Sequence, residues 1–191
     1  GRLVVPGLVL TPNYSVEFWF NSALLPSTVK ESATLYDWGG DRLQISGSTT
    51  ETTGRLQLGG RVGRTPIKSK QWNHVVLVRE ADRVRVYLNG VMAPELEVEA
   101  VKDLSRNSLC LAGAWDGEDR FEGRIDEVAL FSRSLMSAEI RQHFRAAERE
   151  ESAALSPADS MAQIHVRDGY TIELVAAEPL VMDPVAIDWG S

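Results

Sequence analysis

Residues 71–90, QWNHVVLVREADRVRVYLNG, predict two adjacent β-strands and decide the fold class of the chain. The first run, Val75–Val78, is continuously apolar, which is typical of a strand buried on both faces. The second run, 83–88, alternates apolar residues with arginines and a tyrosine, as expected for a strand with one wetter face. Glu80–Asp82 would connect the strands, and Asn89–Gly90 tolerates the positive φ of the next reversal. The stretch therefore predicts a central strand beside a half-buried one.

Similar short runs recur between turn residues along the first two thirds of the chain, a spacing typical of an all-β sandwich. Within Ser15–Asn21, a period of two places the valine and both phenylalanines on one face and Glu17 and Trp19 on the other. One face of that strand is therefore predicted to be core. The expected strands are Arg2–Val5, Ser15–Asn21, Ala33–Trp38, Arg42–Ser46, Arg55–Gly59, Asn73–Arg79, Arg83–Leu88, Leu109–Ala112 and Gly123–Phe131.

Composition limits the classes of partner. The 20 Lys and Arg residues against 27 Asp and Glu give a formal net charge of -7, so we expect no nucleic-acid partner. No apolar run approaches the roughly 20 residues of a membrane-spanning helix, so we expect a soluble piece without membrane insertion. The single cysteine, Cys110, is predicted to be a buried strand thiol, and it allows no intrachain disulfide. The lack of disulfides leaves export open.

The periodicity changes after Leu135. In SAEIRQHFRAAERE, Ile140 and Phe144 recur at helical spacing, and Ser137 is the expected N-cap with an acidic residue in the first turn. An amphipathic helix is therefore predicted over 138–150, closing the β domain.

Three segments follow from these patterns. A β domain with its closing helix is predicted over 1–147, and a small, polar, proline-broken linker over 148–163. The tail, 164–191, regains strand character around an Asp-Gly turn and predicts the truncated start of a further domain.

Three stretches in this order and spacing resemble one family: SVEFWF, the stretch at 71–90, and FEGRIDEVALFSRSLMSAEI. They are similar to the laminin-G-like members of the concanavalin A-like lectin and glucanase superfamily, over about residues 1–146. The resemblance implies a two-sheet antiparallel jelly roll, with a curved sheet that often holds ligand and a helix packed outside. Family members usually begin with a further strand before the segment matching GRLVVP, which is absent here. Function must come from the site, because the superfamily contains lectins, glycosidases, adhesion modules and spacers.

The tail carries a second resemblance. DGYTIELVAAEPLVMDPVAIDWG is similar to the opening of propeller-type dehydrogenase domains in large multidomain proteins of planctomycetes and their relatives. This implies an exported protein, secreted or held in the periplasm or at the cell surface of a bacterium. Such proteins often carry a c-type haem domain, but the chain contains no Cys-x-x-Cys-His run.

Catalysis has little support in the sequence, so we expect this piece not to be an enzyme. Retaining glucanases of the superfamily carry a Glu-x-Asp-x-x-Glu strand motif, and the chain lacks it. The nearest run, Glu95–Glu99, places three carboxylates on one face, which favours a solvated edge strand that resists aggregation. His74 is interpreted as a satisfied strand histidine, and the spacing of His143 and His165 matches no zinc site.

Calcium is an open alternative, because two glycine-containing loops offer carboxylates and carbonyls. Asp37 and Asp41 lie in one loop, and Asp116 and Asp119 lie in the other. The competing interpretation is that these residues cap their own turns. Asp126 is a further candidate, because the resemblance implies a structural calcium ligand at that strand position.

Carbohydrate binding is the remaining chemistry, because sugars stack their C–H faces on aromatic rings beside planar polar groups. The aromatics not obviously committed to core are Tyr36, Trp38, Tyr87 and Trp115, with rim packing as the alternative for both tryptophans. We therefore expect a non-catalytic interaction module, lectin-like or protein-contacting, next to another domain of the same polypeptide. A glycoside hydrolase or lyase and a structural spacer are the alternatives.

Overall fold

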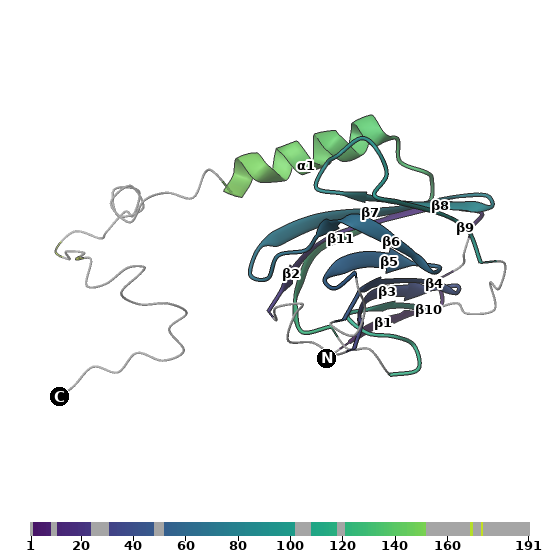
Figure 1. Cartoon of the computed structure of the whole chain (residues 1–191). Coiled ribbons are helices and arrows are strands. Elements are labelled where there is room, and N and C mark those ends of the chain that lie inside the picture. The colour runs from purple at the N-terminus through teal and green to yellow at the C-terminus, as the bar shows by residue number, and fades with distance from the viewer. Residues whose placement is uncertain are drawn as a thin grey trace. The chain divides into compact units, whose positions relative to one another are not determined.

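The computed structural model describes residues 2–8, 11–23, 31–47, 52–101, 108–117 and 121–151, together with 169 and 173. The chain divides into two compact units, Gly1–Ala146 and Ala147–Ser191. The first unit contains two antiparallel sheets stacked face to face (Figure 1), which confirms the predicted jelly-roll-like sandwich. Residues 148–151 of the predicted linker belong to the helix that ends at Glu151, and the rest of the linker, to 163, lies outside the described residues, as does the tail, 164–191, except for 169 and 173.

We call the sheets A and B. Sheet A contains, in spatial order, β1 (Leu3–Pro6), β10 (Ser108–Leu111), β3 (Ala33–Trp38), β4 (Asp41–Ile45), β5 (Arg55–Leu58) and β6 (Arg61–Pro66). Sheet B contains β11 (Gly123–Phe131), β2 (Asn13–Ser22), β7 (Trp72–Glu80), β8 (Arg83–Leu88) and β9 (Leu96–Glu99). The expected strands lacked β6, whose sequence RVGRTP includes a glycine and a proline that lower strand propensity. Its position at the edge of sheet A tolerates both.

The core lies between the facing sides of the two sheets. In β2, Phe18 and Phe20 point inward and lie opposite β7 in an antiparallel register that pairs Phe18 with Val75. Burying each large apolar side chain stabilises the fold by about 1.5–3 kcal/mol. The fully buried residues of this core include Val16, Phe18, Phe20, Leu35, Tyr36, Leu43, Leu56, Val75, Leu77, Val84, Val86 and Leu109.

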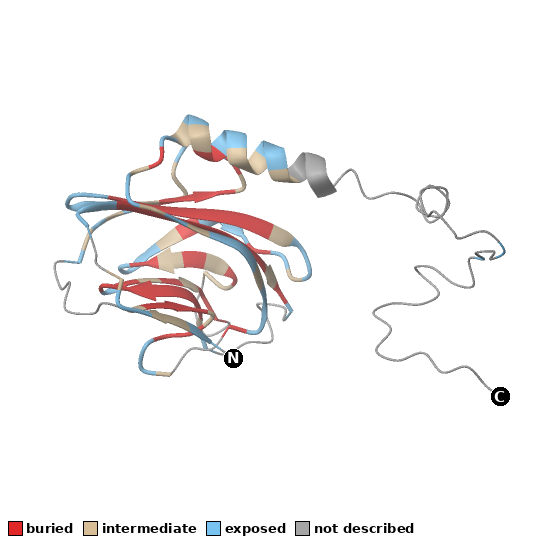
Figure 2. Cartoon of the chain, turned by 180° about the vertical axis from the view of Figure 1, so that it is seen from behind, coloured by how far each residue is buried: buried red, intermediate tan, exposed pale blue. Residues whose placement is uncertain are grey.

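A helix, α1 (Ser137–Glu151), covers the outer face of sheet B with its first turns. Ile140 and the preceding Leu135 pack against Val76, Val78 and Tyr87, so β7 is buried on both faces as its apolar run predicted. Figure 2 shows this strand as a nearly continuous buried band beneath the helix.

The helix begins differently from the expected serine cap. Glu139 Oε2 accepts a hydrogen bond from the Met136 backbone N–H at 2.9 Å, while Ser137 is already helical. Arg133 donates to both oxygens of Glu139, at 3.0 and 2.8 Å. Hydrogen bonding from Arg133 and from the Met136 backbone lowers the pKa of Glu139 to about 2. A side chain in the first turn therefore satisfies an N–H that the helix itself leaves without a partner.

Candidate functional site

A row of polar side chains crosses the outer face of sheet A, away from the core. Strand pairing places Gln44 beside Thr34 on one side and beside Gln57 on the other. Gln57 Nε2 donates to Ser32 Oγ at 2.8 Å and to Gln44 Oε1 at 3.2 Å, and Gln44 Nε2 donates to Thr34 Oγ1 at 3.2 Å. Both glutamines are partly exposed. The network thus holds two planar amides in fixed orientations at the surface.

A second polar row lies two residues away along β4, from Gln44 to Arg42, and three along β3, from Thr34 to Asp37, because β3 contains an extra residue there. Arg42 Nη2 donates to Asp37 Oδ2 at 3.1 Å and to Asp116 Oδ2 at 2.9 Å. Burial lowers the pKa of Arg42, but hydrogen bonds and charge from Asp116 and Asp37 outweigh it, so the net shift is upward. The Trp115 backbone N–H donates to Asp37 Oδ2 at 3.0 Å, and Arg2 Nη1 donates to the Trp115 carbonyl at 3.0 Å. These bonds anchor the backbone of Trp115, and the residue is 43% exposed.

We call these two rows the polar face. It contains Ser32, Thr34, Asp37, Arg42, Gln44, Gln57 and Asp116, with Trp115 at its end. Thr34 and Asp37 are buried, so the other members form its accessible part.

Two of the aromatic candidates lie in the core, which corrects the expectation that they were not committed to it. Tyr36 is completely buried and Trp38 is 4% exposed. A β-bulge between Thr34 and Tyr36 breaks the alternation of β3, so Leu35 and Tyr36 both lie in the core. The Tyr36 hydroxyl hydrogen-bonds Tyr14 at 2.8 Å, and the Tyr14 and Trp38 rings lie 4.8 Å apart.

Tyr87 is also buried, because α1 covers the outer face of β8 that the sequence pattern assigned to solvent. Of the four aromatic candidates, only Trp115 is therefore exposed. Trp19 packs against the helix, stacked on Phe144 with ring centroids 5.6 Å apart.

Residues 2–141 match the family described as the concanavalin A-like lectin/glucanases superfamily. The chain belongs to this superfamily. Residues 156–191 of this concanavalin A-like protein match a second family, described as a domain of unknown function. A comparison with curated proteins found no match.

Solved structures share the concanavalin A-like fold at low sequence identity. Domain 4 of AbnA, a GH43 extracellular arabinanase from Geobacillus stearothermophilus in complex with arabinotriose, is 23% identical with a TM-score of 0.55, covering 72% of this chain and 68% of that one. A heptameric SAP-like pentraxin from Limulus polyphemus is 14% identical with a TM-score of 0.52, covering 73% and 72%. The botulinum neurotoxin serotype D ligand binding domain in complex with N-acetylneuraminic acid is 13% identical with a TM-score of 0.51, covering 76% and 40%. At these identities the likeness shows the fold alone.

The acidic candidates of this concanavalin A-like domain do not gather at one point. Asp37 and Asp116 meet at Arg42, whereas Asp41 points into the sandwich and pairs with Arg79. Asp126 Oδ1 accepts the N–H of the next residue in β11, and Asp119 lies outside the described residues. Among the residues that the structure describes, no group of three His, Cys, Asp or Glu side chains could hold a metal ion. Calcium binding stays a prediction.

A buried carboxylate network lies beneath α1, and sequence patterns did not indicate it. Glu17 of β2 lies 2.7 Å from His74 Nε2 of β7 through Oε1, and 2.9 Å from His143 Nδ1 of the helix through Oε2. Burial raises the pKa of Glu17, but hydrogen bonds from His74 and His143 outweigh it, so the net pKa lies below its ordinary value. Because α1 covers Glu17, this network attaches the helix to the sheet and offers no open site. The expected satisfied histidine, His74, is bonded through Nε2, while its Nδ1 has no partner among the described residues.

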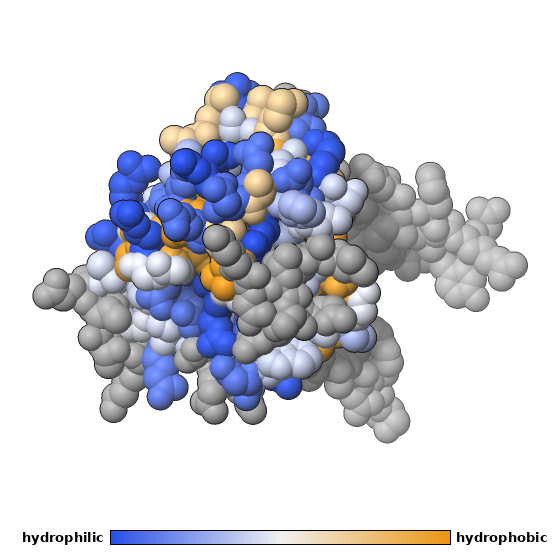
Figure 3. Space-filling view, turned by 90° about the vertical axis from the view of Figure 1, so that its right-hand side faces the viewer, coloured by the Kyte–Doolittle hydropathy of each residue, from blue (hydrophilic) through white to orange (hydrophobic). Residues whose placement is uncertain are grey.

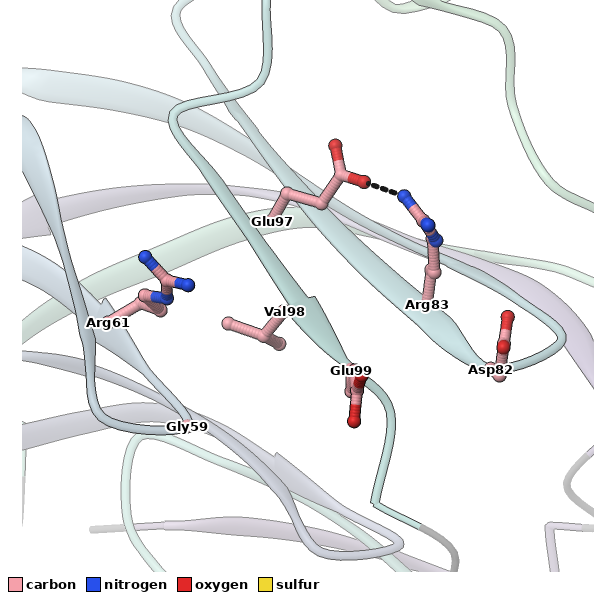
Figure 4. A pocket seen from close by; sticks show the side chains of 7 residues that line it. All are labelled: Gly59, Arg61, Asp82, Arg83, Glu97, Val98 and Glu99. Carbon is pink, nitrogen blue, oxygen red and sulfur yellow. Dashed lines mark hydrogen bonds and ion pairs between the residues drawn. The ribbon is translucent and has the colours of Figure 1, made fainter.

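The carboxylates of the Glu95–Glu99 run have structural partners or face solvent. Glu97 Oε1 accepts a hydrogen bond from Arg83 at 2.7 Å (Figure 4). Glu95 accepts hydrogen bonds from the backbone N–H groups of Arg64 and Thr65. A pocket of about 420 Å³ separates β9 from the turn between β5 and β6, and its lining is mainly charged. Figure 3 shows hydrophilic residues over most of the described surface on this side of the molecule. This arrangement fits a charged edge strand.

No described helix of the chain is both long and apolar enough to span a membrane.

Proposed function

We propose that this concanavalin A-like domain is a non-catalytic glycan-binding module, and that the polar face with Trp115 is its binding surface. The observation that carries the proposal is an exposed tryptophan with an anchored backbone, on the same face as two planar amides held by hydrogen bonds. An aromatic ring gives a platform for the apolar face of a sugar, and amides exchange hydrogen bonds with its hydroxyls.

The spacing of the face suits an extended glycan. The Asp37–Arg42 row lies beside Trp115, and the Gln44–Gln57 row follows two residues further along β4. Two strand residues span roughly 7 Å, about the length of one sugar ring. A ring stacked on Trp115 would therefore place the next sugar unit near the amides.

The carboxylates of the face support binding rather than hydrolysis. Glycosidases need one carboxyl group held protonated as an acid and a second that acts as nucleophile or base. Asp37 and Asp116 instead share one guanidinium as a counterion. The arabinotriose and N-acetylneuraminic acid complexes of the similar structures support a sugar ligand for this chain as well.

The first test is a glycan array with and without calcium, followed by calorimetry on each hit. Truncating an aromatic platform removes stacking of about 0.5–1.5 kcal/mol or more, so Trp115→Ala should weaken binding about tenfold. Met136→Ala is the matched control, because Met136 is 66% exposed and lies beside α1, on the opposite side of the sandwich.

Two results would count against the proposal. Silence on the array from a demonstrably folded domain would favour a structural spacer, and turnover of a bound glycan would favour a hydrolase or lyase. If glycan binding requires calcium, the aspartates of the two loops become the candidate ligands of the ion.

For the whole protein we propose export and a neighbouring dehydrogenase domain, on the tail's resemblance. Residues 156–191 match a family without assigned function, so that match does not test the dehydrogenase proposal. A dye-linked dehydrogenase assay on the complete polypeptide, together with its cell fractionation, tests both parts.

A further inference from the structure

One cation lies at the end of the polar face remote from Trp115. Arg55 begins β5, two residues before Gln57, and alternation places both side chains on the outer side of sheet A, opposite the buried Leu56 and Leu58. The side chain of Arg55 is partly exposed and forms no hydrogen bond or ion pair among the described residues. Arg42, by contrast, is bound by two carboxylates. Arg55 therefore presents an unpaired guanidinium with several donors.

Gln57 supplies an acceptor next to this cation. Its Nε2 hydrogens are used by Ser32 Oγ at 2.8 Å and Gln44 Oε1 at 3.2 Å, which fixes the amide plane. Its Oε1 atom has no donor among the described residues. A ligand at this position must therefore offer an anionic or acceptor group to Arg55 and a donor, such as a hydroxyl, to Gln57.

The hairpin that carries Arg55 favours an anion in spite of the net charge of -7. Residues 52–66, which include β5 and β6, carry three arginines and no acidic residue. Of these arginines, Arg64 uses its Nη2 atom on the Pro94 carbonyl, and Arg61 lies at the far end of the hairpin beside the charged pocket. The β5–β6 hairpin is thus basic in its own sequence, and Arg55 itself is unpaired among the described residues. The neighbouring carboxylates are Glu31, next to Ser32, and Glu95, which is bound to Thr65. The end at Trp115 has its charge compensated by Asp37 and Asp116.

We infer that the sugar unit bound over Arg55 and Gln57 is a uronate. Its carboxylate pairs with the Arg55 guanidinium through two parallel N–H donors, and one of its ring hydroxyls donates to Gln57 Oε1. This inference rests on the proposed function and names the class of glycan: a chain that contains carboxylate-bearing sugars, with another ring on Trp115.

The test uses short oligogalacturonides, alginate oligosaccharides and glucuronoxylan fragments, each compared by calorimetry with the same material after its carboxylates are reduced to alcohols. At least one uronate should bind, and its reduced form should bind about tenfold more weakly or worse, because a charge-assisted hydrogen bond is lost. Arg55→Gln should bind both forms equally weakly. Arg61→Gln, the same change of charge on the neighbouring strand, should keep the wild-type preference.

Arg55→Lys refines the test, because lysine keeps the charge and loses the fork geometry; it should retain only part of the preference. Equal binding of native and reduced forms, or a preference that survives in Arg55→Gln, overturns the uronate inference and leaves the glycan-binding proposal intact. Binding of neutral glycans only would likewise overturn the uronate inference and leave the glycan-binding proposal intact. Failure of every glycan to bind a folded domain overturns both. A thermal unfolding scan of each variant shows that the domain is folded.

Discussion

The carboxylate of Glu17 accepts hydrogen bonds from two histidines that lie 57 and 126 residues further along the chain. Each oxygen has one partner, and both partners lie beneath or within the helix that closes sheet B. A buried carboxylate without partners would strongly disfavour folding. The two histidines offset this desolvation cost, and the bond to His143 holds α1 in place.

Replacing Glu17 by Gln should destabilise the domain by about 1–3 kcal/mol at pH 7, because a charged acceptor of two hydrogen bonds is lost. The pKa of Glu17 is depressed below its ordinary value of 4.5, so its contribution is present above that value. The contribution disappears as the pH falls through the folded-state pKa, where the carboxylate is protonated. Urea unfolding of wild type and variant should therefore differ at pH 7 and converge as the pH falls below 4.5.

Glu99→Gln is the control, because Glu99 is exposed on β9 and should leave the unfolding midpoint unchanged. A constant difference between wild type and Glu17→Gln over the whole pH range would show that the carboxylate charge does not act in this way.

Single residues were the hardest features to predict from sequence. The alternation in β2 correctly placed Glu17 opposite the core, but only tertiary structure brings His74 and His143 to it. Trp115 could be recognised as a loop tryptophan beside polar residues, whereas the contacts of Gln44, Gln57 and Arg42 depend on strand register. The register between strands cannot be predicted from the local sequence pattern.

At the scale of elements, the helix and the reversal after β8 fit against each other. Gly90 has φ +66°, and a Cβ added there would lie 2.5 Å from Cδ1 of Phe144 on α1. The glycine is therefore needed both for the backbone of the turn and for the approach of the helix. The Asn89–Gly90 pattern predicted the turn, but the packing against Phe144 required the structure.

Gly90→Ala should destabilise the domain more than Gly60→Ala does. Comparing the two variants separates the cost of backbone strain from the cost of the clash with Phe144. Gly60 has φ +77° and nothing within 4 Å of an added Cβ, so its change should cost only about 1–2 kcal/mol of backbone strain. Gly90→Ala should cost about 1–3 kcal/mol more, because the methyl group overpacks the contact with Phe144. Denaturant unfolding of both variants gives the difference.

A Phe144→Ala background tests the cause. There, the excess cost of Gly90→Ala over Gly60→Ala should largely vanish. An unchanged excess would assign the effect to the turn alone.

Element type and order followed well from the sequence, and the errors have local causes. Regular alternation predicted β2 and β8, and continuous apolar character predicted β7. The alternation rule failed in β3 because of its bulge. One extra residue moves every side chain that follows it to the other face of the strand. Tyr87 was misassigned for a different reason: the helix covers a face that alternation alone marks as exposed.

At the scale of the whole sandwich, one buried ion pair joins the two sheets. Arg79 of β7 in sheet B lies 2.5 Å from Asp41 of β4 in sheet A, and both side chains are at most 5% exposed. The Val101 backbone completes the arrangement, since its carbonyl accepts from Arg79 and its N–H donates to Asp41. Asp41, predicted as a loop calcium ligand, thus acts inside the fold.

Removing one partner of this pair should cost about 3–5 kcal/mol, because the other charge is left buried and unpaired. Arg79→Met and Asp41→Leu should each lower the free energy of unfolding by that amount. The double variant should be no less stable than either single variant, because no uncompensated charge remains. Guanidinium unfolding of the three variants measures the coupling, and strictly additive losses would contradict it.

The helix and the polar face lie on opposite outer sides of the sandwich: α1 on sheet B, and the glutamine row on sheet A. The chain leaves the first unit through that helix, at Ala146. A glycan lying on sheet A would therefore leave the contacts between α1 and sheet B untouched. Within the first unit, occupation of the polar face and attachment of the closing helix are independent, so ligand binding needs no rearrangement of α1.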